Sequence, residues 1–196
     1  HRLIRRQRQM CIRDRYKTQW NIKKEIIMNK NVKLTKIMVV TIMIALDIVL
    51  SPIFRIEGMA PMSSVMNIIA GVILGPVYAV VMAVVTGIIR MLMLGIPPLA
   101  LTGSIFGAFG AGILYKYGRN MYWSMFGEFF GTGIVGSLIS VPVMVWFTGQ
   151  QQNLYWFVYT PRFVGATIIG SVIAYFVLVN LLKINSFKEI QRMFVG

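Results

Sequence analysis

The feature that most constrains this chain is a succession of apolar segments, each near the length of a bilayer crossing, separated by clusters of Pro, Gly and charged residues. A spanning helix takes about 20 apolar residues, because its backbone must satisfy its own hydrogen bonds across the hydrocarbon. Of the 196 residues, 57% are hydrophobic and 13% are charged, whereas a soluble domain has about 25% charged residues. The sequence therefore predicts an all-α integral membrane protein with no separate soluble catalytic domain.

The positions of the breakers predict six transmembrane helices. Ser51-Pro52 is expected to end the first helix. Gly75-Pro76 is expected to separate the second from the third, because proline suits a first helical turn. Small residues four positions apart, such as Gly103 and Gly107, let helices approach closely and favour a compact bundle. The expected ranges are 36–50, 62–74, 76–94, 99–117, 122–147 and 159–182.

Residues 1–27 differ from the rest in charge, since they hold half of the formal net charge of +14. They contain no apolar stretch that would make them a signal peptide. The run Met10-Cys11-Ile12-Arg13-Asp14-Arg15 resembles a translated sequencing adaptor, and Lys24-Glu25 can be encoded by a ribosome-binding sequence just before Met28. We expect residues 1–27 to be a non-native leader and residues 28–196 to form the membrane domain, with no nucleic acid as partner. The alternative is a genuine basic arm that binds lipid or RNA.

The remaining Lys and Arg residues are unevenly divided between the two ends of the expected helices. Positive residues mark the cytoplasmic side of a membrane protein, and an even number of spans places both termini on one side. We therefore expect both termini in the cytoplasm and the loop 148–160 outside. The side of the termini holds Lys30, Lys33, Lys36, Lys116, Arg119, Lys183, Lys188 and Arg192, and the opposite side holds Arg55, Arg90 and Arg162.

Several polar side chains fall within the expected spans, where ionisable groups are costly and are therefore candidates for function. Counting about 1.5 Å per residue places five of them in one outer layer, beneath the aromatic residues Tyr155, Trp156 and Tyr159. This layer predicts a small polar and aromatic pocket open to the outside. The five residues are Asp47, Asn67, Arg90, Ser104 and Arg162.

These residues allow more than one role. For Asp47 we expect a structural or coupling role, as an ion pair with Arg90 or Arg162 that holds helices together. Asn67 and Arg90 are the candidate hydrogen-bond donors to a ligand, and the loop aromatics either stack on a ligand or anchor the chain among lipid headgroups. Glu128 is expected in the inner half of the fifth helix, as a structural or coupling carboxylate rather than a ligand contact.

The motifs of catalysis and energy conversion are absent from the sequence. It has no Walker A loop, no H-E-x-x-H and no G-x-S-x-G elbow. The single cysteine, Cys11, and the single histidine, His1, exclude a disulfide framework and a thiolate metal cage. We expect a non-catalytic subunit with no metal and no cofactor.

Four motifs lie in the expected spans: Met66-Asn67-Ile68-Ile69-Ala70-Gly71-Val72-Ile73-Leu74-Gly75-Pro76-Val77-Tyr78-Ala79, then Gly87-x-x-Arg90, Gly103-Ser104-x-x-Gly107-Ala108, and Gly127-Glu128-x-x-Gly131-Thr132-Gly133-x-x-Gly136 with Pro142. Together they resemble the motifs of the ThiW family. The resemblance covers about residues 33–182. Members of that family are substrate-binding S components of energy-coupling factor (ECF) vitamin transporters.

The resemblance implies a six-helix bundle in a prokaryotic plasma membrane, working with a membrane-embedded T subunit and two cytosolic ATPases. It implies that the ligand is the hydroxyethylthiazole precursor of thiamine, a small ring with one hydroxyl. Thr41-x-x-x-Ala45 occupies the place of the small-residue face that contacts the T subunit in such systems. The substrate-binding residues that we expect are Asn67, Arg90, Ser104, Tyr155, Trp156, Tyr159 and Arg162.

The chain departs from the family pattern at two places on the expected substrate side. Ser63-Ser64 stands where a polar pair with a histidine is expected, and Ile96-Pro97-Pro98 stands where a Gly/Thr-rich turn is expected. One alternative is therefore an S component for another vitamin or precursor. An alternative from a different class is a membrane-embedded enzyme or structural subunit that acts on lipid, with Arg90 and Arg162 holding a headgroup.

Overall fold

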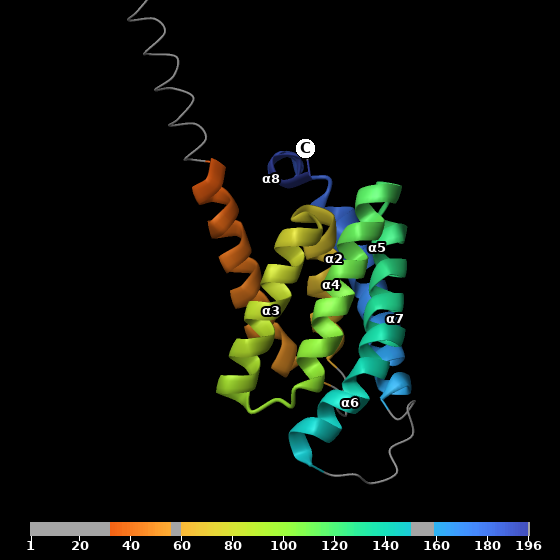
Figure 1. The fold of residues 1–196 in the computed structure, drawn as a ribbon. Coiled ribbons are helices and arrows are strands. Elements are labelled where there is room, and N and C mark those ends of the chain that lie inside the picture. The colour runs from red at the N-terminus through yellow and green to blue at the C-terminus, as the bar shows by residue number, and fades with distance from the viewer. Residues whose placement is uncertain (1–31, 56–59, 150–158, 196) are drawn as a thin grey trace, which may run out of the picture. The chain divides into compact units, whose positions relative to one another are not determined.

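The computed structural model describes residues 32–55, 60–149 and 159–195 (Figure 1), and these residues form helices and no strand. The expected leader 1–27 and the loop residues Tyr155 and Trp156 lie outside them. Residues 39–196 form one compact unit, to which every contact given below belongs. The helices are Val32–Ile53, α2 (Pro61–Ile73), α3 (Gly75–Leu94), α4 (Leu99–Gly118), α5 (Met121–Glu128), the π-helix η1 (Phe129–Gly136), α6 (Ser137–Thr148), α7 (Thr160–Leu181) and α8 (Asn185–Val195).

The all-α membrane architecture expected from the sequence is confirmed. Within the described part of the chain, five helices are long and apolar enough to cross a membrane, with α5, η1 and α6 acting together as one span. Most helix ends lie within one or two residues of the positions expected from the sequence. The first helix is the exception, because it continues through Ser51-Pro52 to Ile53. A proline in a last turn removes only one hydrogen bond, so it need not end the helix where it stands.

The short helix α2 lies at the centre of the bundle. Every residue of it except Met62 is buried, and it packs against α3, α4, α5, α7 and α8. A Cβ on Gly71 would lie 2.9 Å from the backbone of Ala111 and Gly112, so α2 and α4 approach as closely as backbones allow. Because its neighbours enclose it, α2 does not have to match the bilayer thickness.

The span expected over 122–147 contains a π-helical segment that the apolar pattern did not indicate. η1 has three glycines among eight residues and packs against α4. Thr132 Oγ1 lies 2.9 Å from the carbonyl oxygen of Gly103, and a Cβ on Gly131 would overlap the backbone carbonyl of Phe106. π-helical turns inside α-helices are often found at functional sites.

The amphipathic helix α8 is a further element that the sequence analysis did not predict. Its partly buried residues Phe187, Ile190 and Phe194 pack against the core. Gln191 Nε2 donates to the carbonyl oxygen of Val72 (3.0 Å) and to the Tyr115 hydroxyl (2.6 Å). α8 is too short and too charged to read as a span, but its apolar residues recur at helical spacing, and that signal could have revealed it.

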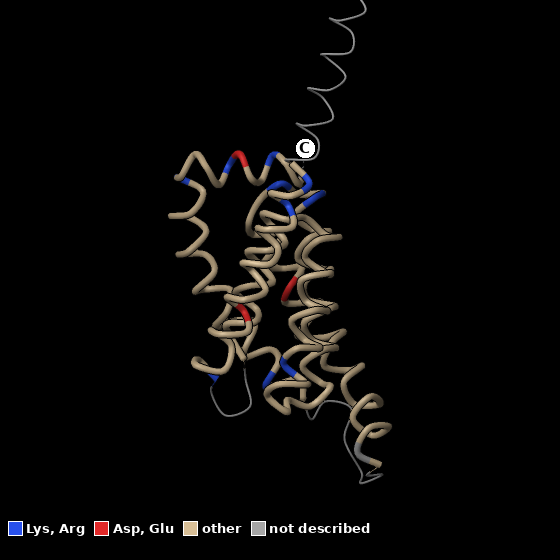
Figure 2. The backbone as a smooth tube through the Cα atoms, turned by 90° about the vertical axis from the view of Figure 1, so that its left-hand side faces the viewer, with Lys and Arg blue, Asp and Glu red and all other residues tan. Residues whose placement is uncertain are grey.

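The two ends of the bundle differ. One end carries α8 and the loop between α4 and α5. The other carries the loop between α3 and α4 and the starts of α2 and α7 (Figure 1). Lys and Arg lie at these two ends rather than along the middle of the helices (Figure 2). Among the described residues of the unit 39–196, the basic residues at the α8 end are Lys116, Arg119, Lys183, Lys188 and Arg192, and those at the opposite end are Arg55, Arg90 and Arg162.

Candidate functional site

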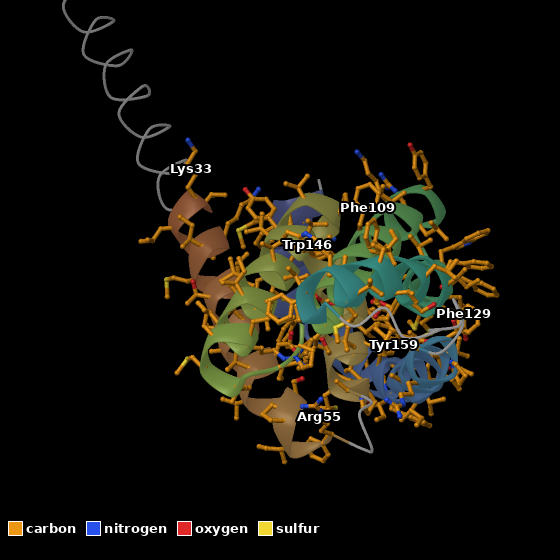
Figure 3. All side chains as sticks on the ribbon, turned by 60° about the horizontal axis from the view of Figure 1, so that its bottom comes forward. Lys33, Arg55, Phe109, Phe129, Trp146 and Tyr159 are labelled. Atoms are coloured by element: carbon orange, nitrogen blue, oxygen red, sulfur yellow. The ribbon has the colours of Figure 1, made fainter. Side chains whose placement is uncertain are left out.

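A cavity of about 240 Å³ opens at the end of the bundle opposite α8. Figure 3 brings this end forward and labels Arg55 and Tyr159, which both line the cavity. The first turns of α2, α4 and α7, the last turns of α3 and the middle of the α5–η1 span form its walls. The lining residues are Arg55, Ala60, Ser63, Ser64, Asn67, Arg90, Ile96, Pro97, Leu99, Ala100, Gly103, Ser104, Glu128, Thr132, Tyr159, Arg162, Phe163 and Ala166.

The structure brings together most of the substrate-binding residues expected from the sequence. Asn67, Arg90, Ser104, Tyr159 and Arg162 all line the cavity. The other two, Tyr155 and Trp156, lie outside the described residues. Four of the five residues of the expected polar layer therefore line one cavity, and Asp47 is the one that does not.

Arg90 is the buried cation of the site. It is 3% exposed, and its Nη1 donates to Ser63 Oγ at 3.1 Å, whereas its Nε has no hydrogen-bond partner among the described residues. Asp47, which is 1% exposed and does not line the cavity, interacts electrostatically with Arg90, and no described residue bonds its Oδ1. Arg90 thus has a charged neighbour outside the cavity lining and one buried N–H group that no described residue accepts.

Asn67 and Glu128 meet in the interior of the bundle. Asn67 Nδ2 donates to Glu128 Oε1 and to the carbonyl oxygen of Ser104, both at 3.3 Å. The same Glu128 oxygen lies 2.9 Å from Thr132 Oγ1. Asn67 Oδ1 and Glu128 Oε2 have no hydrogen-bond partner in the described part of the chain, although both residues are almost fully buried. Two acceptor atoms from two helices are therefore unpaired within the described residues.

Glu128, which was expected in the inner half of the fifth helix as a structural or coupling carboxylate, also lines the cavity. α2 has only 13 residues, so Asn67, less than two turns from its first residue, already stands at its middle. The span that begins at Met121 is twice as long, and its eighth residue reaches the same level. Counting depth along each helix separately misses this meeting point, because helices of unequal length do not start at the same depth.

The sequence analysis did not assign three other polar lining residues, Ser63, Ser64 and Thr132. Their spacing carried a usable signal. Ser63 and Ser64 precede Asn67 by four and three positions, and Thr132 follows Glu128 by four, so each set shares one helix face. A polar face on an otherwise apolar helix indicates a buried polar site.

The outer part of the cavity combines exposed cations with apolar surface. Arg55 and Arg162 are exposed, Tyr159 is half-buried, and Pro97 and Phe163 provide apolar wall. No group of three or more His, Cys, Asp or Glu side chains that could hold a metal occurs among the described residues. The arrangement is suited to binding: apolar walls surround a few directed polar groups, as in small-molecule sites.

The two residues expected to contact a T subunit lie elsewhere. Thr41 and Ala45 are exposed on the helix Val32–Ile53, next to exposed Ile42 and Leu46, and neither lines the cavity.

The family model described as "Thiamine-precursor transporter protein (ThiW)" matches residues 37–184, a stretch that contains every lining residue of the cavity and ends just before α8. None of the curated proteins and none of the solved structures compared with the chain matches it.

Proposed function

The chain belongs to the ThiW family of thiamine-precursor transporters, and from this premise we propose that it is the substrate-binding S component of an ECF-type importer. It is a multi-pass membrane protein of a transporter family that handles a small molecule. In the proposed arrangement it captures the ligand outside, and a membrane-embedded T subunit with two ATPases drives its release inside. The sequence has no nucleotide-binding motif of its own, which fits a subunit that depends on partners for energy.

The observation that carries this proposal is the cavity at one end of the bundle. Its volume of about 240 Å³ lies below the roughly 300–1,000 Å³ of drug-sized sites, so it suits a small ring. Buried Arg90 and Asn67 supply directed polar groups in walls that are otherwise largely apolar. We propose the hydroxyethylthiazole precursor of thiamine as the ligand.

The proposed ligand contacts are the expected substrate-binding residues: Asn67, Arg90, Ser104, Tyr155, Trp156, Tyr159 and Arg162. In this proposal Asp47 positions Arg90, since it is buried and interacts with that cation. The cavity faces the outside and the α8 end faces the cytoplasm of a prokaryotic cell, in keeping with the greater number of basic residues at the α8 end. The exposed pair Thr41 and Ala45 is the proposed contact with the T subunit.

Binding of hydroxyethylthiazole to the purified protein in detergent, measured by titration calorimetry, tests the proposal. Arg90→Ala and Asn67→Ala are each expected to weaken binding by at least about tenfold, because each removes a buried hydrogen-bonding group worth about 1.5 kcal/mol or more. Arg119→Ala, an exposed arginine between α4 and α5, is the matched control and should bind normally.

Unchanged affinity in both cavity variants would remove the proposed site. Mass spectrometry of the compound that co-purifies with the protein separates the alternatives. If the co-purified compound is another vitamin or precursor, the proposed ligand is wrong and the proposed S-component role stands. A phospholipid as the only bound compound, with no thiazole binding, would instead favour a subunit that acts on lipid.

A further inference from the structure

Three polar atoms of residues that line the cavity have no hydrogen-bond partner among the described residues: Arg90 Nε, Asn67 Oδ1 and Glu128 Oε2. The three side chains are 3%, 1% and 0% exposed. Buried polar groups in folded proteins are nearly always hydrogen-bonded, and a group that is not bonded usually has a functional reason. All three belong to residues of one small cavity, which makes a shared ligand the simplest reason.

Whether the two inner atoms donate or accept a hydrogen bond follows from the bonds that their side chains already make. The Asn67 amide nitrogen faces two acceptors, the Ser104 carbonyl oxygen and Glu128 Oε1, so its Oδ1 is the group left over. Asn67 and Thr132 both contact Glu128 through Oε1, and Ser64 also lies beside this carboxyl. Glu128 Oε2 and Asn67 Oδ1 are therefore the acceptor atoms of these two side chains that lack a hydrogen-bond partner among the described residues.

The carboxyl of Glu128 is held in place rather than free to turn away. A Cβ on Gly107 would overlap both Thr132 Oγ1 and Glu128 Oε2, so the side chain lies directly against the backbone of α4. Arg90 supplies the opposite chemistry, because its Nε is a donor that needs an acceptor. Residues of the cavity lining thus carry a pair of acceptor atoms where α2 meets α5 and a donor near the end of α3.

We propose, resting on the function proposed above, that Glu128 is a specificity-determining ligand contact. Together with Asn67 it accepts the hydrogen of the hydroxyl group on the ligand's ethyl arm, while Arg90 donates to an acceptor on the heterocycle. The site therefore selects small heterocycles that carry both a hydroxyl donor and a ring acceptor. A ring of the same size without the hydroxyl leaves the two buried oxygens unpaired, which a site built around a hydrogen bond strongly disfavours.

The test compares two ligands of nearly equal size: 4-methyl-5-(2-hydroxyethyl)thiazole and 4-methyl-5-ethylthiazole, which lacks only the hydroxyl. Titration calorimetry of the full chain in detergent gives both affinities, and their ratio is the readout. The wild-type chain is expected to prefer the alcohol by at least about 100-fold. In Glu128→Met, which keeps the length but removes both oxygens, the ratio should fall to within about threefold of unity.

The ratio compares two ligands on the same variant, so a general loss of stability does not mimic the effect. Ser124→Ala is the matched control. Ser124 stands one turn before Glu128 and does not line the cavity. The substitution removes its buried hydrogen bond to the Ile68 carbonyl oxygen and should leave the ratio unchanged. If Glu128→Met does not fold, Glu128→Gln decides instead, with an expected decrease in the ratio of at least about tenfold.

The outcomes separate this inference from the function on which it rests. Failure of the wild-type chain to bind the thiazole alcohol would overturn the proposed function. Equal binding of both thiazoles by the wild-type chain would leave the function standing and overturn the role of Glu128. A ratio of 100 or more that persists in the Glu128 variant would also overturn that role.

Discussion

At the scale of single residues, this bundle places polar side chains in its interior by setting them against glycine. Glu128 and Thr132 lie over Gly107, and Gly103 accepts from Thr132 through its carbonyl oxygen. In a membrane, where lipid competes equally for apolar surface, close backbone contact and interhelical hydrogen bonds are what hold helices together. The glycines therefore serve both the packing of α4 and the position of the site.

Gly107→Ala tests this arrangement. The added methyl group would overlap Thr132 Oγ1 and Glu128 Oε2, and such overpacking costs about 1–3 kcal/mol. We expect a lower midpoint of thermal unfolding in detergent and at least tenfold weaker thiazole binding. Gly133→Ala is the control, because its Cβ would meet nothing closer than Val164 Cγ2 at 3.4 Å. Equal effects of the two substitutions would show that the close contact at Gly107 is unimportant.

At the scale of elements, α8 completes the end of the bundle opposite the cavity. The last carbonyl groups of a helix lack partners within the helix, and Gln191 donates to one of these at Val72, near the end of α2. The ring of Phe194 packs edge-on against Tyr78 with centroids 5.0 Å apart. The amphipathic helix α8 thus caps the end of the central buried helix α2.

Gln191→Ala is expected to loosen α8. It removes the donor to Val72 and to the Tyr115 hydroxyl, and a buried acceptor left without a partner costs about 1–3 kcal/mol. Hydrogen exchange followed by mass spectrometry should show faster exchange of the α8 amides. Glu189→Ala, an exposed position on the same helix, should exchange at the wild-type rate, and an equally protected α8 in Gln191→Ala would contradict the capping role.

The helix Val32–Ile53 carries the proposed docking face. Ala45 is exposed and does not line the cavity, so Ala45→Trp should leave thiazole binding unchanged and reduce uptake by cells at least tenfold by blocking close approach of the partner helix. Val172→Trp places the same bulk on α7, at a residue that is 55% exposed, and should transport normally. Normal uptake by Ala45→Trp would place the contact elsewhere.

At the scale of the whole membrane domain, the cavity and α8 lie at opposite ends. The orientation of the domain in the membrane therefore decides to which side the cavity opens. The end with α8 has the larger number of basic residues among those described, and such residues are retained on the cytoplasmic side. In the proposed orientation the cavity is open to the outside, where the ligand would be captured.

Cysteine labelling of intact cells tests this orientation. In a chain with Cys11→Ser, Arg55→Cys at the cavity end should react with a membrane-impermeant maleimide added outside, and Lys188→Cys on α8 should react only after the cells are broken. Both positions are exposed, so access to the reagent depends on the side of the membrane. The reverse pattern would invert the proposed direction of capture.

Local patterns in the sequence determined most of the helices of this protein, because the length of an apolar run and the breakers at its ends act within one segment. They also placed Asn67, Arg90 and Ser104 in one outer layer, since all three stand within two turns of a predictable helix end. The same local reasoning missed α8, which is too short and too charged to read as a span.

Only the tertiary structure decided what depends on the relation between helices. The pairing of Asn67 with Glu128 depends on where the short α2 meets the long span that begins at Met121, and neither segment alone contains that information. The π-helical turn likewise arises where glycines of η1 press against the backbone of α4. Spacing along one helix specifies which side chains share a face, but the depth at which two faces meet is set by the packing of the whole bundle.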